Sequence, residues 1–138
     1  MSATVAQTRG GLAARLATIS GLTVYTTVPA TPIAPCAVIR PTKGSYDTTI
    51  ANGGDEYSYD VVVLATQAAT AWDTAQELLD EYLARSGARS IRAAVQGDVS
   101  LGGYAHTCRV TGWSDYGTMS LAGADWFGVR FTVEVWPT

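Results

Sequence analysis

The side chains best suited to chemistry are a single histidine and two cysteines. His106 and Cys108 lie two positions apart, and Cys36 lies far upstream. Residues i and i+2 of a strand point to the same face, so His106 and Cys108 would be two converging metal ligands. A closed zinc site needs four ligands, and no paired-cysteine or paired-histidine motif supplies the others. We therefore expect a half-buried imidazole, a small apolar thiol, and no metal or cofactor.

A catalytic cysteine or a disulfide is also not expected. Side chains at i and i+2 of a strand are about 6–7 Å apart, beyond the hydrogen-bond reach that a Cys–His pair needs. A disulfide between Cys36 and Cys108 would be feasible if their strands were neighbours. Because no secretory signal is recognisable, we expect assembly in the cytoplasm, which favours free thiols. An enzyme needs clustered ionisable groups in a cleft, and one histidine without an evident partner does not provide them. We predict a protein that is not an enzyme.

The charged residues of the second predicted helix and its C-terminal flank form a candidate interface. Four carboxylates share the helix face opposite its apolar stripe, and three arginines follow closely. Such charges are either a solvated surface, with Glu81 and Arg85 pairing along the helix, or a surface that docks against other copies of the chain. The candidate residues are Asp73, Glu77, Asp80, Glu81, Arg85, Arg89 and Arg92.

A second candidate interface is the tip of a predicted β-hairpin. Residues 52–55 read Asn-Gly-Gly-Asp, which tolerate positive φ, between two strand-like flanks. The hairpin tip should project from the sheet and contact neighbouring subunits. Its candidate contact residues are Tyr46, Asp47, Asn52, Gly53, Gly54 and Asp55.

Aromatic residues near predicted strand ends also favour assembly. The chain has four Trp and seven Tyr, and aromatic side chains are common interface anchors. The alternative is that a single copy of the chain covers both faces of its own sheet. The residues concerned are Tyr46, Tyr57, Tyr59, Trp113, Tyr116, Trp126 and Trp136.

Length and composition limit the protein class. A chain of 138 residues with 47% hydrophobic and 15% charged residues is expected to fold as one domain, residues 1–138, with its own core. The net charge of -3 has the wrong sign for binding driven by DNA phosphates. Residues 16–39 carry no charge, but prolines and glycine interrupt them, so no membrane span is expected. No secretory signal is recognisable at the start.

The first half of the chain should hold one helix and several strands. Residues 2–20 have helical periodicity, interrupted by Gly10 and Gly11, which mark either a close packing contact or the end of a mobile arm at residues 1–9. Strands are expected at residues 22–28 and 36–40 and in both arms of the hairpin. The second arm alternates and then becomes apolar on both faces at residues 61–64, typical of a sheet centre.

The second half should hold another helix and two long strands. A helix is expected to begin at Thr70 and to end at Gly87. Residues 90–96 fit either a short helix or a strand. Residues 104–114 and 126–136 alternate as strands, with a Gly-rich connection between them. The predicted fold is therefore a single α+β domain with a mostly antiparallel sheet, a protruding hairpin and two main helices.

Four segments of this sequence resemble a known protein family. They are Ser90-Ile91-Arg92-Ala93-Ala94, Leu101-Gly102-Gly103, Arg109-Val110-Thr111-Gly112-Trp113-Ser114-Asp115-Tyr116-Gly117 and Gly128-Val129-Arg130-Phe131-Thr132-Val133-Glu134-Val135. Together with the order of elements they resemble the tail-terminator proteins of long-tailed (siphovirus-type) phages that infect actinobacteria. The likeness extends over nearly the whole chain and is strongest after Ser90. These segments are structural and contain no catalytic signature.

The resemblance implies a structural virion protein similar to the lambda-type tail terminator. Such a protein would form a homo-oligomeric ring, a hexamer, at the head-proximal end of the tail tube. There it would stop tube polymerisation and offer a surface to the head-tail connector, while genome DNA passes through the lumen without sequence-specific binding. The alternatives are another neck component, such as a head-completion or tail tube protein, and a small ligand-binding or hydrolytic domain.

Subunit size is compatible with such a ring. A compact domain of this length has a diameter of about 37 Å. Six touching spheres of that diameter enclose a hole of about 37 Å, whereas four enclose only about 15 Å, too narrow for a duplex of roughly 20 Å.

Overall fold

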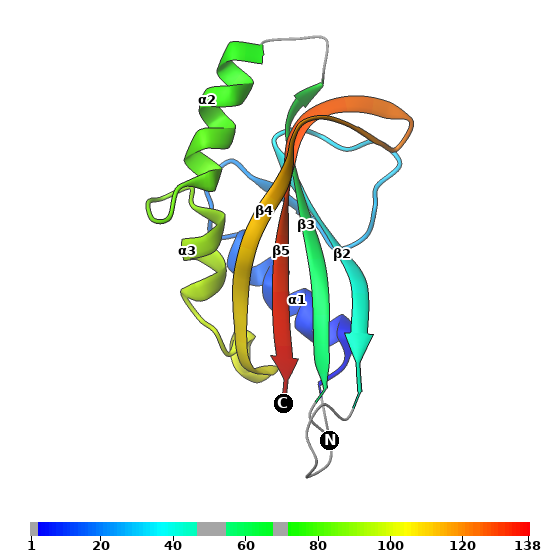
Figure 1. The fold of residues 1–138 in the computed structure, drawn as a ribbon, viewed down its shortest axis with the longest axis vertical. Helices are drawn as coiled ribbons and strands as arrows, with labels where there is room; N and C mark the ends of the chain where they lie inside the picture. Colours follow the sequence, from blue (N-terminus) through cyan, green and yellow to red (C-terminus); the bar gives the residue numbers. More distant parts are fainter. Residues whose placement is uncertain (1–2, 47–54, 68–71) are drawn as a thin grey trace.

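The computed structural model describes residues 3–46, 55–67 and 72–138, which form one five-stranded sheet with helices on one face (Figure 1). The strand order is β1-β2-β3-β5-β4. β1 is parallel to β2, and the other neighbours are antiparallel. This is the predicted α+β fold. The strands are β1 (Thr23–Tyr25), β2 (Cys36–Ser45), β3 (Glu56–Gln67), β4 (Ala105–Leu121) and β5 (Ala124–Pro137).

The long strands β2 and β3 form the two arms of the predicted hairpin. Their pairing extends from Cys36↔Leu64 to Ser45↔Glu56, with one bulge between Pro41 and Lys43. The expected strand at residues 36–40 and the first hairpin arm are therefore one continuous strand, so three strands rather than about four precede the second helix. The predicted tip, residues 47–54, lies outside the described residues.

The connection between β4 and β5 differs from the prediction. Residues 115–121 and 124–125 continue the two strands, and only Ala122 and Gly123 turn the chain, with φ values of 52° and 77°. Two successive positive φ values are typical of a tight type I′ hairpin turn. The expected Gly-rich connection is wrong because glycines at bulges, such as Gly117, occur inside the strand rather than in a loop.

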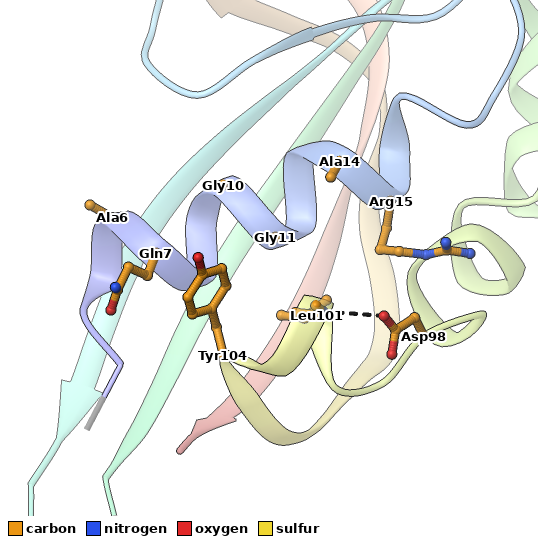
Figure 2. Close-up of a pocket in the computed structure, with 10 residues that line it drawn as sticks. Ala6, Gln7, Gly10, Gly11, Ala14, Arg15, Asp98, Leu101 and Tyr104 are labelled. Carbon is orange, nitrogen blue, oxygen red and sulfur yellow. Dashed lines mark hydrogen bonds between the residues drawn. The ribbon is translucent and has the colours of Figure 1, made fainter. Parts of the chain in front are cut away.

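Helix α1 (Val5–Leu16) begins with a capping box in which Thr4 and Gln7 bond each other's backbone amides. The helix continues through both glycines, so the alternative of a mobile arm at residues 1–9 is wrong for the helical part of that range. The packing alternative is correct at Gly11. A Cβ there would lie 2.8 Å from both the Cβ and the carbonyl oxygen of Leu101, so α1 approaches that turn closely (Figure 2).

Two further helices, α2 (Trp72–Leu83) and α3 (Ile91–Gln96), and a 3₁₀ turn (Leu101–Gly103) complete the helical layer. Ser90 caps α3 by accepting a hydrogen bond from the amide of Ala93, which resolves the undecided segment as a helix. α2 ends at Leu83, four residues before the expected stop at Gly87.

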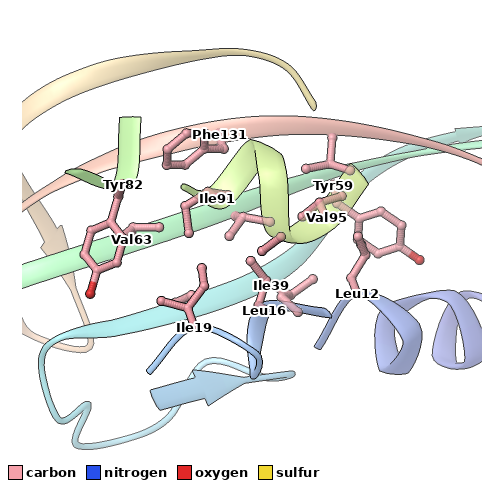
Figure 3. Packing of buried hydrophobic residues seen from close by; sticks show 14 of the residues in the cluster. Leu12, Leu16, Ile19, Ile39, Tyr59, Val63, Tyr82, Ile91, Val95 and Phe131 are labelled. Carbon is pink, nitrogen blue, oxygen red and sulfur yellow. The ribbon is translucent and has the colours of Figure 1, made fainter. Parts of the chain in front are cut away.

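The main core lies between these helices and one face of the sheet (Figure 3). Alternate residues of β3 and β5 face it, as the alternation predicts, because successive strand side chains point to opposite faces. On β3 the core-facing residues include Tyr59 and Val63, and on β5 they include Phe131. From α2, Leu79 and Tyr82 complete this core, and both are buried.

A smaller apolar cluster covers part of the opposite face. The cluster contains Val62 and Leu64 of β3 and Cys36 and Val38 of β2. The far end of the β4–β5 hairpin supplies Leu121 and Trp126, and in Figure 1 this end curls over the sheet. The remainder of this face is polar, so it is only partly covered within one copy of the chain.

Candidate assembly surfaces

Most of the acidic and basic groups predicted as an interface are exposed. Asp73, Glu77, Asp80 and Glu81 are all exposed on α2, opposite its buried residues. Arg85 and Arg89 are exposed just beyond the helix, and Arg92 on α3 is half-buried. Six of the seven predicted residues are therefore exposed, but the structure divides the arginines between two surfaces: Arg89 borders a pocket with Glu81, whereas Arg85 and Arg92 border another pocket beside β4.

The pairing within this group differs from the prediction. Glu81 bonds Arg89, with 2.8 Å between carboxylate oxygen and guanidinium nitrogen, rather than Arg85 one turn away. Both side chains are about half exposed, so the pair adds little stability. Asp80 accepts a hydrogen bond of 3.4 Å from the hydroxyl of Tyr116 on β4, which links α2 to the edge strand.

The hairpin arm is described only at its base. Tyr46 follows the end of β2 and is 76% exposed, and Asp55, which precedes β3, is half-buried. Burial raises the pKa of Tyr57, and the charge of Asp55 raises it further. Asp47, Asn52, Gly53 and Gly54 lie outside the described residues.

Of the seven predicted aromatic anchors, three are buried, Trp136 is half-buried, and three, including Tyr46, are exposed. Tyr57, Tyr59 and Trp126 are buried, so they belong to the cores of a single copy. Trp113 and Tyr116 on β4 are exposed, at 53% and 37%. Their ring centroids are 6.3 Å apart, and Tyr116 also meets Phe127 edge to face.

The histidine and the cysteines do not converge. A bulge between Ala105 and Thr107 changes the alternation, so His106 is exposed whereas Cys108 is buried in the main core. The half-buried imidazole that the sequence predicts is therefore wrong. Across residues 3–46, 55–67 and 72–138, no group of three or more His, Cys, Asp and Glu side chains is placed to hold a metal ion.

The two cysteines are free thiols on opposite faces of the sheet. Their strands, β2 and β4, are separated by β3 and β5, so the condition for a disulfide is not met. Burial raises the pKa of each thiol to about 11. Neither cysteine is therefore a thiolate at neutral pH.

A groove of about 450 Å³ lies between α1 and the turn at residues 98–104 (Figure 2). Its acidic residue, Asp98, accepts hydrogen bonds from Ser100 and from the amide of Gly102, which lower the pKa of its carboxyl. The Nε of Arg15 donates to the carbonyl of Ala94. The carboxylate of Asp98 and the Nε of Arg15 therefore help to hold the turn and α3 in place.

Sequence reasoning missed a charged network on the polar sheet face. Asp60 of β3 lies 3.9 Å from Arg40 of β2 and 3.6 Å from Arg130 of β5, and Arg130 lies 3.2 Å from Asp115 of β4. Of these four residues, only Arg40 and Asp60 occupy facing positions of adjacent strands, whereas Arg130 faces Val62 and Ser114, so the network could be predicted only from the strand order and register. The network crosses four strands and ties the polar face together.

No family model matches the chain, and no match was found among the curated proteins. In the described part of the chain, no helix is long and apolar enough to cross a membrane. The fold and surfaces define a single-sheet α+β protein in which several exposed apolar residues, among them Ile33 and Trp113, lie at the two edges of the sheet.

Proposed function

We propose that this chain is a structural virion protein, the tail terminator of a long-tailed phage. It would cap the head-proximal end of the tail tube as a ring of six copies, stop tube polymerisation and present a surface to the head-tail connector. Its place would be the neck of the virion after assembly in the host cytoplasm. No catalytic step is part of this function.

The observation that supports the proposal most is where the exposed apolar side chains lie. Val28 and Ile33 follow β1 at one edge of the sheet, Tyr46 marks the base of the hairpin arm, and Trp113 and Tyr116 lie on β4 at the other edge. Apolar groups on two opposite edges favour head-to-tail contacts between identical subunits, and such contacts form a ring where the rotation between successive copies closes.

Termination then depends on a missing surface. One face of the ring would complement the last ring of the tube, and the other face would lack the surface that recruits a further tube subunit. The acidic α2 face and the β2–β3 arm are the surfaces available for these contacts. DNA would pass through the lumen without being bound, since the chain is acidic overall.

Electron microscopy of particles produced without this gene tests the proposal. We expect overlong tubes that lack heads, and complementation with the intact gene should restore joined tails of normal length. Normal tails in the absence of the gene would overturn the proposal. Purified chain that polymerises into long tubes would identify a tube subunit instead.

A deletion of residues 52–55 tests the role of the arm. The last residue pair between β2 and β3 is Ser45↔Glu56, so the deletion removes no residue of the strand pairing and the fold should survive. We expect a normal unfolding transition but few head-joined tails when this variant complements the missing gene. Normal complementation would remove the arm from the proposed interface.

A further inference from the structure

The exposed edge of β4 forms one wall of a groove of about 340 Å³ whose other wall is the connection between α2 and α3. Trp113 is its most exposed aromatic residue. In Figure 1, α2 and α3 lie beside β4 at this edge of the sheet. The groove is lined by Leu83, Arg85, Arg92, Val110, Thr111, Gly112, Trp113 and Phe131.

The charged and aromatic side chains of the groove that can form hydrogen bonds are all donors. The guanidinium groups of Arg85 and Arg92 and the indole N–H of Trp113 can only donate. None of the three takes part in the ion pairs or hydrogen bonds found among the described residues. The hydroxyl of Thr111 already donates to the carbonyl of Thr132. A matching ligand therefore presents oxygen acceptors to the two guanidinium groups and the indole N–H, and apolar groups to Val110, Trp113 and Phe131.

One segment of the same chain has this chemistry. Residues 26–35, the proline-rich loop, read TTVPATPIAP and carry no charge. Their three prolines have no amide hydrogen, and the amide of Ile33 is already bonded to the hydroxyl of Tyr25. Val28 and Ile33 are 48% and 67% exposed. The loop thus presents apolar side chains together with carbonyl acceptors.

The proline-rich loop is also held in shape before it binds. Its ends are fixed by the hydrogen bond from Thr23 to the carbonyl of Pro35 and by the bond from Arg9 to the carbonyl of Thr26. A segment that is already ordered loses little conformational entropy on docking. Proline-rich segments bind aromatic-lined grooves in other proteins for this reason.

The groove and the loop cannot meet within one copy of the chain. The loop follows β1 and the groove borders β4, which are opposite edges of the sheet. At the level of the groove four strand spacings separate these edges, about 19 Å. Only the far end of the β4–β5 hairpin returns toward the loop, where Met119 and Ala34 pack on the same apolar cluster. A contact between two different surfaces of identical subunits is head-to-tail, and it repeats around a ring where the rotation between copies closes.

We propose that the proline-rich loop of one copy docks in the Trp113 groove of the next copy. This inference rests on the proposed function, because it describes the subunit contact that would close the ring. Ile33 and Val28 would pack against Trp113 and its neighbours, while Arg85 and Arg92 donate to carbonyl groups of the loop.

A cysteine pair tests the contact in the full-length chain. The variant Ile33→Cys, Thr111→Cys places one thiol on the loop and one in the groove. The control variant Ile33→Cys, Thr107→Cys keeps the loop thiol but moves the second to an exposed position of β4 outside the groove. Because Cys36 and Cys108 are buried, the native thiols should stay unreactive during oxidation with diamide.

The oxidised proteins are compared on a non-reducing gel, with ring formation measured separately by native mass spectrometry, alone and on tail tubes. We expect the Ile33/Thr111 variant to give a ladder of linked copies up to the ring number and the control to remain unlinked. Rings that form without this ladder would overturn the loop contact and leave the proposed function standing. Failure to form rings in either setting would overturn both.

A peptide measurement identifies the occupant independently. A synthetic peptide of residues 26–36 should quench or shift the tryptophan fluorescence of the intact protein, and the change should be lost in the Trp113→Phe variant. An Ile33→Asp peptide should bind about tenfold more weakly, since a carboxylate would be placed against apolar walls. A peptide that binds while the chain forms no ring would assign the groove to another protein's proline-rich segment and overturn the contact between copies.

Discussion

Gly10 and Gly11 are adjacent on α1, but their surroundings differ completely. A Cβ at Gly10 would meet nothing within 4 Å, whereas a Cβ at Gly11 would meet Leu101. Gly10→Ala should therefore raise the free energy of unfolding by about 0.5–1 kcal/mol, because alanine is the better helix former. Gly11→Ala should lower it by about 1–3 kcal/mol through overpacking. Urea unfolding of the two variants checks both signs, and equal effects would contradict the close contact.

The buried thiols make stability depend on alkaline pH. Burial raises the pKa of Cys36 and Cys108 from 9.0 to about 11. Between these values the unfolded chain loses thiol protons that the folded chain keeps, so the free energy of unfolding falls as the pH rises from 9 toward 11. Below pH 9 this contribution is fully present.

Urea unfolding at several pH values measures this decline. The double variant Cys36→Ala, Cys108→Ala should show a shallower decline over the same range than the unaltered chain. Burial also raises the pKa of Tyr59 and Tyr82, so part of the decline should persist in the variant. Identical slopes in the two proteins would show that the thiols are not buried as described.

At the scale of elements, the tight turn between β4 and β5 carries an unfavourable residue. Ala122 has a φ of 52°, a left-handed conformation that costs an ordinary residue about 1–2 kcal/mol. Ala122→Asn should raise the free energy of unfolding by about 0.5–1 kcal/mol, because Asn-Gly favours a type I′ turn. Ala122→Val should lower it. Thermal unfolding of both variants checks the order, and a destabilising Asn would contradict the turn assignment.

The same turn shows where prediction from sequence fails. Alternation identified β3 and β5, because their two faces meet different surroundings at every second residue. It could not place the β4–β5 turn, since Ala122 is not a typical turn residue and the bulges near Gly112 and Gly117 break the alternation of β4. The helix at residues 91–96 was undecided because six residues carry too little periodicity.

The candidate surfaces were predictable only in part. The charges of α2 could be placed on one face because helix spacing alone determines that arrangement. The pairing of Glu81 with Arg89 could not be predicted, because it depends on how the chain folds back after the helix. The sequence places most of the proline-rich loop between two predicted strands, but its position opposite the Trp113 groove follows from strand order, which the sequence does not determine.

At the scale of the whole molecule, the arrangement of charge disfavours binding to DNA. The chain has nine basic and twelve acidic residues, and three of the arginines are in ion pairs with carboxylates. Arg40 and Arg130 lie against Asp60, and Arg89 lies against Glu81. The net charge of -3 opposes the replacement of the counterions that surround a duplex, and that exchange supplies most of the free energy of non-specific binding.

We therefore expect no measurable binding of a short duplex at about 150 mM salt with protein up to about 100 µM, the weak end of non-specific affinity. Fluorescence anisotropy of a labelled duplex measures this for the chain and for the closed ring. The ring is the decisive sample, because a lumen built from several copies would multiply any local positive potential. Micromolar binding that weakens steeply as salt increases would show a basic lumen, and a conduit that retains DNA in this way is contrary to the proposed role.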